Sequence, residues 1–583
     1  MSETSPVAPL AVRERFLTDP DLGAGNFLDH ALRHNPNPDL PLVYTHSTDP
    51  RGQVQLRGHS LRDLEALRDQ YARWYHANGV RVGDPVAVVV RDGLQPIIHF
   101  LALSALGAIA ALVNDAMPVA TAKRYLDHVG VVGVVADDQR RLAAEYRPGQ
   151  ARPRFLVWSG EVRGHDPESG SLPEGYPFQH GPDDIVALIH SSGTTGTPKS
   201  TMVAHRQFWV GKESRMVRFP AEDYDRLLSL MPHTHAGGLS YLLTTVLLGL
   251  PTLTMSDWRR AAVEPVMAAF QPTMVASFPR TFVQLATGEA PTAAAAKVHT
   301  WFNTGDSAHH GHIRKLVRLG TRPSGLIQPW LLPQGAPDSQ GLPGSRFIDG
   351  LGSSEMGMAL FGQVHTPESE RDDRAIGAPV AVVEKAAVLD DAGDELPDGE
   401  VGNLAVRTPS RTPGYWNDSE LTATFELNGY WLTGDVARRT ADGRFYHLDR
   451  TVDVIHTGAG PVYTLQLEEV VIAECDGWVL DASVVGVQDA TGPVPIAVAQ
   501  TIVDIEPTEA LEQANKALST AGLATLRALV LLDAGEDFPL GPTGKVLKRH
   551  LRTRFAALFT SGVDGARVAV ADNSQPLRSR RNR

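Results

Sequence analysis

The chain has 583 residues, 42% of them hydrophobic and 21% charged, which is the composition of a globular protein too long for one hydrophobic core. The formal net charge is −13 and no basic stripe crosses the body of the chain, which excludes a protein that acts mainly by binding nucleic acid or an anionic membrane. The single cysteine, Cys475, excludes an internal disulfide framework, and residues 1–20 lack the apolar core of a secretory signal, so a cytoplasmic protein is expected.

From the N-terminus to about residue 450, segments with helical spacing of apolar residues alternate with short β-rich runs. The most apolar run, 97–113, is shorter than the ~20 residues of a membrane span, and we expect a buried helix there. Strands interleaved with helices predict a large α/β body of several subdomains over residues 1–450. The predicted helices are 61–75, 97–113, 205 onward and 265–270, and the predicted strands are 85–90, 131–136, 184–190, 251–255 and 274–278.

Residues 322–345 are rich in proline and glycine, which indicates either a long loop near the site or a disordered insertion. Beyond residue 450 the pattern changes to that of a compact α+β domain over residues 451–560. Residues 561–583 are polar, end in a basic run, and are predicted to form a disordered tail. The predicted strands of the smaller domain are 452–456, 483–487, 495–503 and 526–532, and its predicted helices are 465–474, 507–521 and 545–558.

The segment 191–199, Ser-Ser-Gly-Thr-Thr-Gly-Thr-Pro-Lys, directly follows a predicted buried strand. Glycines let a backbone approach an anion closely, and hydroxyl and N–H groups supply donors, as a phosphate cradle requires. It is not a Walker loop, because Pro198 precedes Lys199 where that motif has glycine. A plain Ser/Thr/Gly linker is the alternative, but a linker does not normally sit between a buried strand and a helix.

This segment resembles the signature loop of the adenylate-forming superfamily, which includes acyl-CoA synthetases, peptide-synthetase adenylation domains and beetle luciferases. Segments 303–308, 349–355, 414–417, 431–435 and 539–545 resemble further motifs of that family in the expected order. The resemblance implies that Glu355 holds Mg²⁺ and that Asp435 and Arg450 contact the ribose of ATP. The implied nucleotide-binding residues are Ser191, Ser192, Gly193, Thr194, Thr195, Gly196, Lys199, Gly305, Asp306, Ser307, Leu351, Ser354, Asp435 and Arg450.

The C-terminal motif Pro-Leu-Gly-Pro-Thr-Gly-Lys, residues 539–545, implies that Lys545 is the adenylation catalyst. A cation there draws two anions together and neutralises the charge that grows on the α-phosphate. The implied catalytic set is Lys545, Glu355, Thr195 and His235.

Residues 232–235, Pro-His-Thr-His, resemble the substrate motif of acyl- and aryl-CoA ligases, in which a histidine flanks the acyl pocket. His235 stands where peptide-synthetase domains carry an aspartate nearby for the substrate ammonium, which disfavours an α-amino acid. Histidines at 233 and 235 and at 309, 310 and 312 lack cysteine or carboxylate companions at ligand spacing, which disfavours zinc. The predicted acyl pocket, with room for a bulky apolar carboxylic acid, consists of His235, Gly237, Gly238, Gly350 and Gly352.

The family reaction forms acyl-AMP from a carboxylate and ATP, and a thiol then displaces AMP. By resemblance, the smaller domain rotates about a hinge at Val452 and brings a pantetheine tunnel with Gly458, Ala459 and Gly460 to the site. The sequence therefore predicts an acyl-CoA ligase that uses ATP, Mg²⁺ and coenzyme A.

Four departures from the family pattern leave alternatives open. Val452 replaces a polar hinge residue, Ser200 a glycine at an expected tight turn, Leu351 the adenine-stacking aromatic residue, and Ala459 a tunnel glycine. One alternative is an enzyme restricted to thioester formation from preformed acyl-AMP. The others are an enzyme that loads a separate carrier protein, and a non-catalytic relative that binds nucleotide or acyl ligand.

Overall fold

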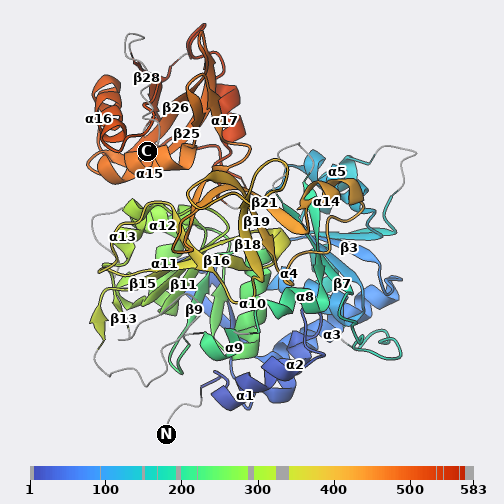
Figure 1. Ribbon diagram of the computed structural model, residues 1–583. Coiled ribbons are helices and arrows are strands. Elements are labelled where there is room, and N and C mark those ends of the chain that lie inside the picture. Colours follow the sequence, from blue (N-terminus) through green and yellow to red (C-terminus); the bar gives the residue numbers. More distant parts are fainter. Residues whose placement is uncertain are drawn as a thin grey trace.

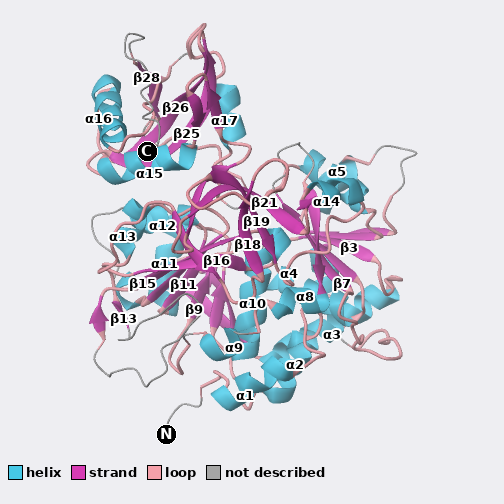
Figure 2. Ribbon diagram, in the orientation of Figure 1, coloured by secondary structure: helices cyan, strands magenta, loops and turns pink. Residues whose placement is uncertain are grey.

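The computed structural model describes residues 5–571, apart from 92, 147–151, 167, 192–197, 214, 220, 287–293, 323–340, 534, 542–543 and 564. A large body holds two sheets with helices packed around them, and a smaller unit of strands and helices sits on one end of it (Figures 1 and 2). The predicted architecture, a large α/β body followed by a smaller α+β unit, is confirmed. Among the described residues, no helix combines the length and the apolarity that a bilayer span needs.

The first sheet of the body has the strand order β6-β5-β3-β4-β7-β8 and is parallel except for the β7–β8 pair. Val86 to Val89 of β3 are all buried, as expected for a parallel strand covered on both faces. The strands are β3 Pro85–Val89, β4 Ile109–Leu112, β5 Gly133–Ala136, β6 Phe155–Trp158, β7 Ile185–Ser191 and β8 Lys199–Ala204. The helices along this part are α3 Leu61–Ala77, α4 Leu94–Ala105, α5 Val119–Val129, α6 Gln139–Ala144, α7 Ser159–Arg163 and α8 His205–Val210.

The prediction of one buried helix over 97–113 is wrong. Helix α4 ends at Ala105, and the chain turns at Gly107, which has φ +71°, before it enters β4. Periodicity does not separate a buried helix from a buried strand when both are uniformly apolar. The glycine within the run was the residue that indicated a turn between them.

The second sheet has the order β18-β19-β21-β22-β17-β16-β15-β12-β11-β9-β10-β1-β2, with β20 paired to β21. Its parallel centre, β10-β9-β11-β12-β15, places the loops after β12 and β15 side by side at one edge, where ligands bind in such sheets. The strands are β1 Val43–Thr48, β2 Val54–His59, β9 Leu227–Ser229, β10 Thr252–Thr254, β11 Met274–Ser277, β12 Thr300–Thr304, β15 Arg346–Gly352, β16 Ala359–His365, β17 Ala375–Pro379, β18 Lys385–Leu389, β19 Val401–Arg407, β20 Glu426–Leu427, β21 Tyr430–Arg439 and β22 Phe445–Arg450. The remaining elements are α1 Leu10–Arg15, α2 Phe27–His34, α9 Arg215–Arg218, α10 Ala236–Leu248, α11 Arg260–Phe270, α12 Pro279–Ala286, α13 His310–Leu316, α14 Ser419–Thr424, and the hairpin β13 Thr321–Arg322 with β14 Leu342–Pro343.

The smaller unit is a four-stranded sheet, β25-β26-β27-β28, with a hairpin, β23-β24, at its start. Alternate residues of β26 enter two apolar clusters, one against α15 and α16 and one against α17, so the sheet is covered on both faces. Its elements are β23 Ile455–Thr457, β24 Gly460–Val462, α15 Thr464–Glu474, β25 Val479–Asp489, β26 Gly492–Thr501, α16 Pro507–Thr520, β27 Ala528–Leu531, α17 Lys548–Arg554 and β28 Arg567–Val570.

Two predictions for this unit are corrected by the structure. Strand β28 lies within the predicted tail, 561–583, where it pairs antiparallel with β27 and buries Ala569. Residues 572–583 lie outside the described part of the chain. Helix α17 begins at Lys548. Lys545 therefore lies in the non-helical segment before it, and not at the start of the predicted helix 545–558.

Candidate active site

A lysine, a tyrosine and a glutamate from three separate segments meet beside β8. Lys199 begins this strand, and the loop 412–417 lies along it through a bridge between Thr201 and Tyr415. The loop also reaches the turn after β15, where Thr412 N donates to Glu355 O at 2.6 Å. As a result the Tyr415 hydroxyl donates to Glu355 Oε1 at 2.7 Å and accepts from Lys199 Nζ at 3.3 Å. Burial lowers the pKa of Lys199, and the charge of Glu355 opposes that shift.

Tyr415→Phe removes the hydroxyl that joins Lys199 and Glu355. Hydrogen bonds to charged groups contribute about 1.5–3 kcal/mol, so we expect ATP-dependent pyrophosphate release to fall about tenfold or more. Steady-state assays at varied ATP and Mg²⁺ concentrations test this expectation. Tyr224→Phe, at a tyrosine with 64% of its surface exposed, serves as the control. Equal rates for the Tyr415 variant and the wild type would contradict the expected link.

Asp435 and Arg450 face each other on adjacent strands of the second sheet. They are register partners on β21 and β22, with Arg450 Nη1 3.2 Å from Asp435 Oδ1. His447 Nε2 lies 3.3 Å from the same oxygen. Although burial opposes it, the Arg450 charge and the His447 hydrogen bond hold the pKa of Asp435 well below its usual range. A buried carboxylate kept ionised in this way can accept hydrogen bonds from a ligand's hydroxyl groups.

The loop after β12 brings Gly305, Asp306 and Ser307 to the same edge. A cavity beside this loop is lined by Asp306, Ser307, Leu351 and residues of β15 and β22. Asn303 Nδ2 donates to Asp349 Oδ1 at 2.6 Å and to Asp306 O at 3.1 Å, which fixes the loop to β15. Burial raises the pKa of Asp349 to about 6.

Lys545 reaches these residues from the smaller unit. Burial lowers its pKa, and Asp306, Asp435 and Glu355 are close enough for their charges to oppose that shift. The preceding Gly544 packs against Trp258 and Arg280. The orientation seen here therefore points Lys545 at the predicted nucleotide residues.

Arg280 of α12 fixes this orientation through three groups of the smaller unit. Its Nη1 lies 2.9 Å from Asp481 Oδ2, and its Nη2 lies 3.0 Å from Gln500 Oε1 and 2.5 Å from Asp537 Oδ1. These partners come from β25, β26 and the loop before Lys545, so one buried guanidinium ties them to the body.

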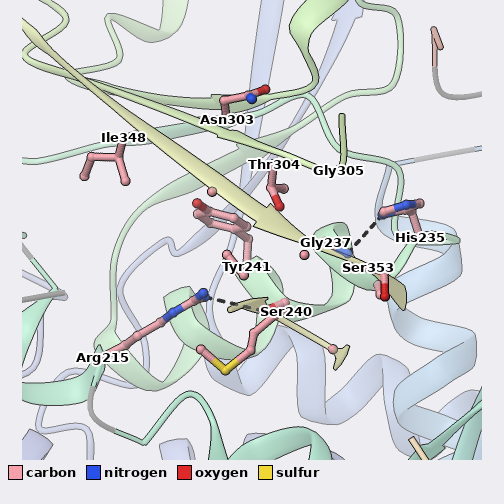
Figure 3. Close-up of a pocket in the computed structure, with 16 residues that line it drawn as sticks. Arg215, His235, Gly237, Ser240, Tyr241, Asn303, Thr304, Gly305, Ile348 and Ser353 are labelled. Atoms are coloured by element: carbon pink, nitrogen blue, oxygen red, sulfur yellow. Dashed lines mark hydrogen bonds between the residues drawn. The ribbon is translucent and has the colours of Figure 1, made fainter. Parts of the chain in front are cut away.

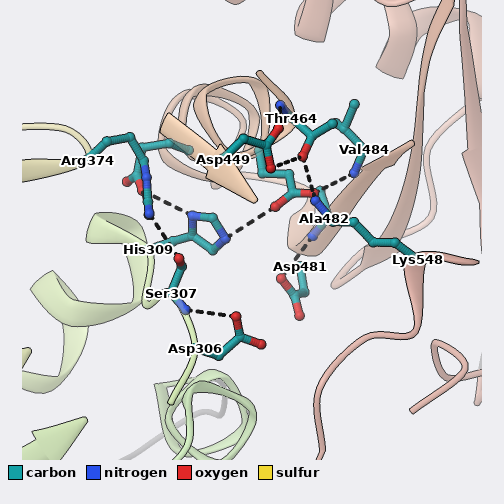
Figure 4. A network of polar contacts seen from close by, with 12 residues as sticks. Asp306, Ser307, His309, Arg374, Asp449, Thr464, Asp481, Ala482, Val484 and Lys548 are labelled. Atoms are coloured by element: carbon teal, nitrogen blue, oxygen red, sulfur yellow. Dashed lines mark hydrogen bonds and ion pairs between the residues drawn. The ribbon is translucent and has the colours of Figure 1, made fainter. Parts of the chain in front are cut away.

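A second cluster of polar contacts crosses from the body to the smaller unit (Figure 4). His309 Nδ1 contacts Glu469 Oε2 at 3.0 Å, and Arg374 Nη1 lies 3.7 Å from the same carboxylate oxygen. The neighbouring Glu468 pairs with Lys548 at 2.8 Å. Although burial opposes it, the hydrogen bond and charge of Glu469 and the charge of Glu468 raise the pKa of His309.

His309→Gln is expected to reduce stability more at pH 6 than at pH 9. A histidine whose folded pKa is raised contributes stability that is complete below the unfolded pKa and is lost as pH rises through the folded value. The pKa of Glu469 is lowered to about 2, so that carboxylate stays ionised across this range. We expect a loss of about 2 kcal/mol at pH 6, measured by urea unfolding. His456→Gln, at an exposed position of β23, is the control, and an equal loss for His309→Gln at both pH values would contradict the expectation.

Several residues of the predicted acyl pocket line a cavity between α10, β12 and β15 (Figure 3). His235 caps α10, where its Nδ1 accepts from Gly237 N at 3.1 Å, and burial, aided by the Lys545 charge, lowers its pKa to about 3. Of the predicted glycines, Gly237, Gly350 and Gly352 line this cavity. Gly238 is not among the lining residues. A Cβ there would lie 2.2 Å from the Pro232 carbonyl oxygen, so this glycine serves backbone packing.

The remaining predicted positions lie in several separate parts of the chain. Ser200 does not sit at a tight turn: it lies in β8 opposite His190, and its hydroxyl is 3.1 Å from that of Tyr125, so it fits without strain. Leu351 lines the cavity beside Asp306 and Ser307, and Ser354 begins a 3-10 turn after β15. Val452 is 57% exposed, and no atom would contact a Cβ at Gly458 or Gly460 in the β23–β24 hairpin. The side chain of Ser191 and all of Ser192, Gly193, Thr194, Thr195 and Gly196 lie outside the described part of the chain.

Glu355 is the side chain that fits a magnesium ion. It places one carboxylate among Lys199, Lys545 and Arg450, and Mg²⁺ commonly takes one or two carboxylates together with phosphate oxygens. Bound there with ATP, the ion would neutralise phosphate charge.

The sequence and the structure both match known adenylating enzymes. The model of the AMP-binding enzyme family matches residues 38–416, and the chain belongs to that family, within the adenylate-forming superfamily. It is 36% identical over 574 residues to a 3-aminoavenalumate diazotase of a Streptomyces species. The alignment covers 94% of this chain and 98% of that protein. It is 23% identical to the 2-succinylbenzoate–CoA ligase of Bacillus thuringiensis subsp. konkukian, over 81% of this chain and 89% of that one.

The fold matches that of the anthranilate CoA ligase AuaEII in complex with anthranoyl-AMP. The TM-score is 0.73 at 19% identity, over 92% of this chain and 98% of the other. Together the comparisons identify an adenylate-forming, acid-activating enzyme.

Proposed function

We propose that this enzyme is an ATP-dependent diazotase, which activates nitrite as its adenylate and transfers the nitrosyl group to an arylamine. The observation that carries the proposal is the 36% identity to a diazotase along nearly the whole of both chains. The name 3-aminoavenalumate describes an amine that is also a carboxylate. Nitrite, like a carboxylate, is an oxyanion that can attack the α-phosphate of ATP.

The proposed reaction has two halves, as in the predicted ligase. First, a nitrite oxygen forms a bond to the α-phosphorus, and the bond to pyrophosphate breaks, giving nitrosyl-AMP. Next, the amine nitrogen attacks the nitroso nitrogen, the N–O bond to AMP breaks, and the amine loses a proton. The resulting N-nitrosamine shifts its remaining N–H proton to oxygen, takes up a proton and releases water, which leaves the diazonium ion. One nitrite oxygen thus leaves in AMP and the other in water.

The residues at the site suit the first half. Lys545 would neutralise charge on the α-phosphate, Lys199 and Glu355 would hold phosphates and Mg²⁺, and Asp435 would accept from the ribose. His235, with a pKa of about 3, is neutral near pH 7 and presents an uncharged wall to the acceptor. A carboxylate at this position would stabilise the protonated amine, which cannot attack. A neutral histidine does not, which suits an amine nucleophile.

A coenzyme A ligase is the second candidate, and the 23% identity to a 2-succinylbenzoate–CoA ligase favours it. In that reading the acid is a carboxylate, the product is a thioester, and the hairpin with Gly458, Ala459 and Gly460 approaches the site after a rotation about Val452. Loading of a carrier protein would use the same first half-reaction.

Product analysis distinguishes the candidates. Every reaction contains the purified enzyme, ATP, Mg²⁺ and 3-aminocinnamate. Nitrite, coenzyme A or both are then added, at pH 8 to suppress uncatalysed diazotisation. A diazotase gives an azo dye with a coupling phenol, one AMP per diazonium, and no need for coenzyme A. A coenzyme A thioester formed without nitrite would contradict the diazotase proposal and support a coenzyme A ligase.

A further inference from the structure

Arg374 lies where the predicted nucleotide residues of the body meet the smaller unit (Figure 4). It directly precedes β17 and has φ +64°, a backbone conformation that residues other than glycine rarely adopt. Its side chain is buried: Nη1 lies 3.7 Å from Glu469 Oε2, Nη2 donates to Ser307 Oγ at 2.9 Å, and Nε donates to His447 O at 3.1 Å. One guanidinium therefore joins α15, the loop after β12 and strand β22.

The same guanidinium determines which nitrogen of His447 carries the proton. Arg374 Nη2 lies 3.1 Å from His447 Nδ1. Because arginine can only donate, Nδ1 accepts this hydrogen bond and the proton of the neutral ring is on Nε2. That Nε2 lies 3.0 Å from Asp449 O and 3.3 Å from Asp435 Oδ1. The ring N–H of His447 therefore faces the carboxylate that is predicted to accept from the ribose.

Glu469, on α15 of the smaller unit, supplies negative charge on the other side of Arg374. It is 2% exposed, and its Oε1 accepts from the backbone N of His310 at 2.7 Å. A buried guanidinium is costly when it loses a paired carboxylate, because its charge is then neither hydrated nor compensated. If α15 moves away from the body, Arg374 loses this partner. The groups that it holds, Ser307 and the ring of His447, are then less firmly placed.

We propose that Arg374 is a positioning residue which, through His447 and Glu469, couples binding of the ribose to the seating of α15 on the body. Such coupling is reciprocal: the seated helix strengthens the hold on the ribose, and a bound ribose strengthens the seating. ATP is then held most firmly in the orientation that brings Lys545 to the site, and AMP leaves more readily once α15 moves away. The proposal rests on the ATP-binding role proposed for Asp435 and not on the acceptor, so it applies equally to a diazotase and to a coenzyme A ligase.

The test compares the binding of ATP with that of 2′,3′-dideoxy-ATP, which lacks both ribose hydroxyls, by isothermal titration calorimetry with Mg²⁺ and without nitrite or amine. The wild type is expected to bind ATP at least about tenfold more tightly, since hydrogen bonds to a carboxylate are lost with the analogue. Glu469→Gln removes a charge at similar volume, and Arg374→Lys keeps a charge but loses the planar fork. Each should lower this ratio by about fivefold or more, through weaker binding of ATP and unchanged binding of the analogue.

The matched control is Glu474→Gln, which removes a half-exposed ion pair between the same helix and Arg371 of the body and should retain the full ratio. A purely structural loss would weaken both nucleotides equally. An unchanged ratio in both Glu469→Gln and Arg374→Lys, an equal fall in the control, or a wild-type preference for ATP that is absent would overturn the coupling. If the ratios behave as expected while nitrite gives no diazonium, the coupling stands and the diazotase proposal fails.

Discussion

Replacing Lys545 with alanine is expected to lower the rate of adenylate formation by about 10²–10³-fold, the usual effect of losing one group that stabilises transition-state charge. The charges of Asp306, Asp435 and Glu355 act on this lysine, so it lies among the predicted nucleotide-binding residues. Because its charge matters most as phosphate charge grows, kcat should fall more than the KM for ATP rises. ATP–pyrophosphate exchange with nitrite measures this half-reaction alone.

The matched control is Lys516→Ala, at an exposed position on α16 of the same unit, which should exchange at the wild-type rate. Near-normal exchange by Lys545→Ala would show that the domain orientation seen here is not the one that adenylates.

Replacing Asp435 with alanine is expected to raise the KM for ATP about 100-fold, since two ribose hydroxyls would lose a charged acceptor and each such bond contributes about 1.5–3 kcal/mol. Asp435 is 4% exposed, and Arg450 and His447 keep its carboxylate ionised, which suits an acceptor of hydrogen bonds from a ligand's hydroxyl groups. Initial rates at varied ATP concentrations give the KM.

Loss of Asp435 also leaves the half-exposed Arg450 without this partner, so the variant can lose stability as well as ATP affinity. Asp435→Asn, which preserves volume, and a melting curve for each variant separate binding from stability. Asp442→Ala, in the exposed turn between the same two strands, should leave the KM unchanged. An unchanged KM in folded Asp435→Ala would remove this residue from the nucleotide site.

The sequence predicted the family, the order of the two units and most elements, because local motifs and periodicities carry that information. The errors arose where tertiary context decides. Gly107 splits one apolar run into α4 and β4, Ser200 is satisfied by Tyr125 from a distant helix, and β28 is a strand because β27 offers it an edge.

The polar framework around the site was harder to predict, since its members are far apart in sequence. Tyr415 was noted only as part of a motif, yet it joins Lys199 to Glu355. Arg215 of α9 and Lys212, in the turn before that helix, belong to no motif found in the sequence, and the burial of a single cation has no signature in composition or periodicity. The phosphate-binding residues do not indicate the acceptor, because adenylation of a carboxylate and of nitrite calls for the same residues.

The most direct test of the central claim is the fate of oxygen from ¹⁸O-labelled nitrite in a single turnover with ATP and 3-aminocinnamate. If nitrite is activated as its adenylate, mass spectrometry will find one ¹⁸O in each AMP formed with the diazonium product. AMP without label, alongside diazonium or a coenzyme A thioester, would contradict activation of nitrite by this enzyme.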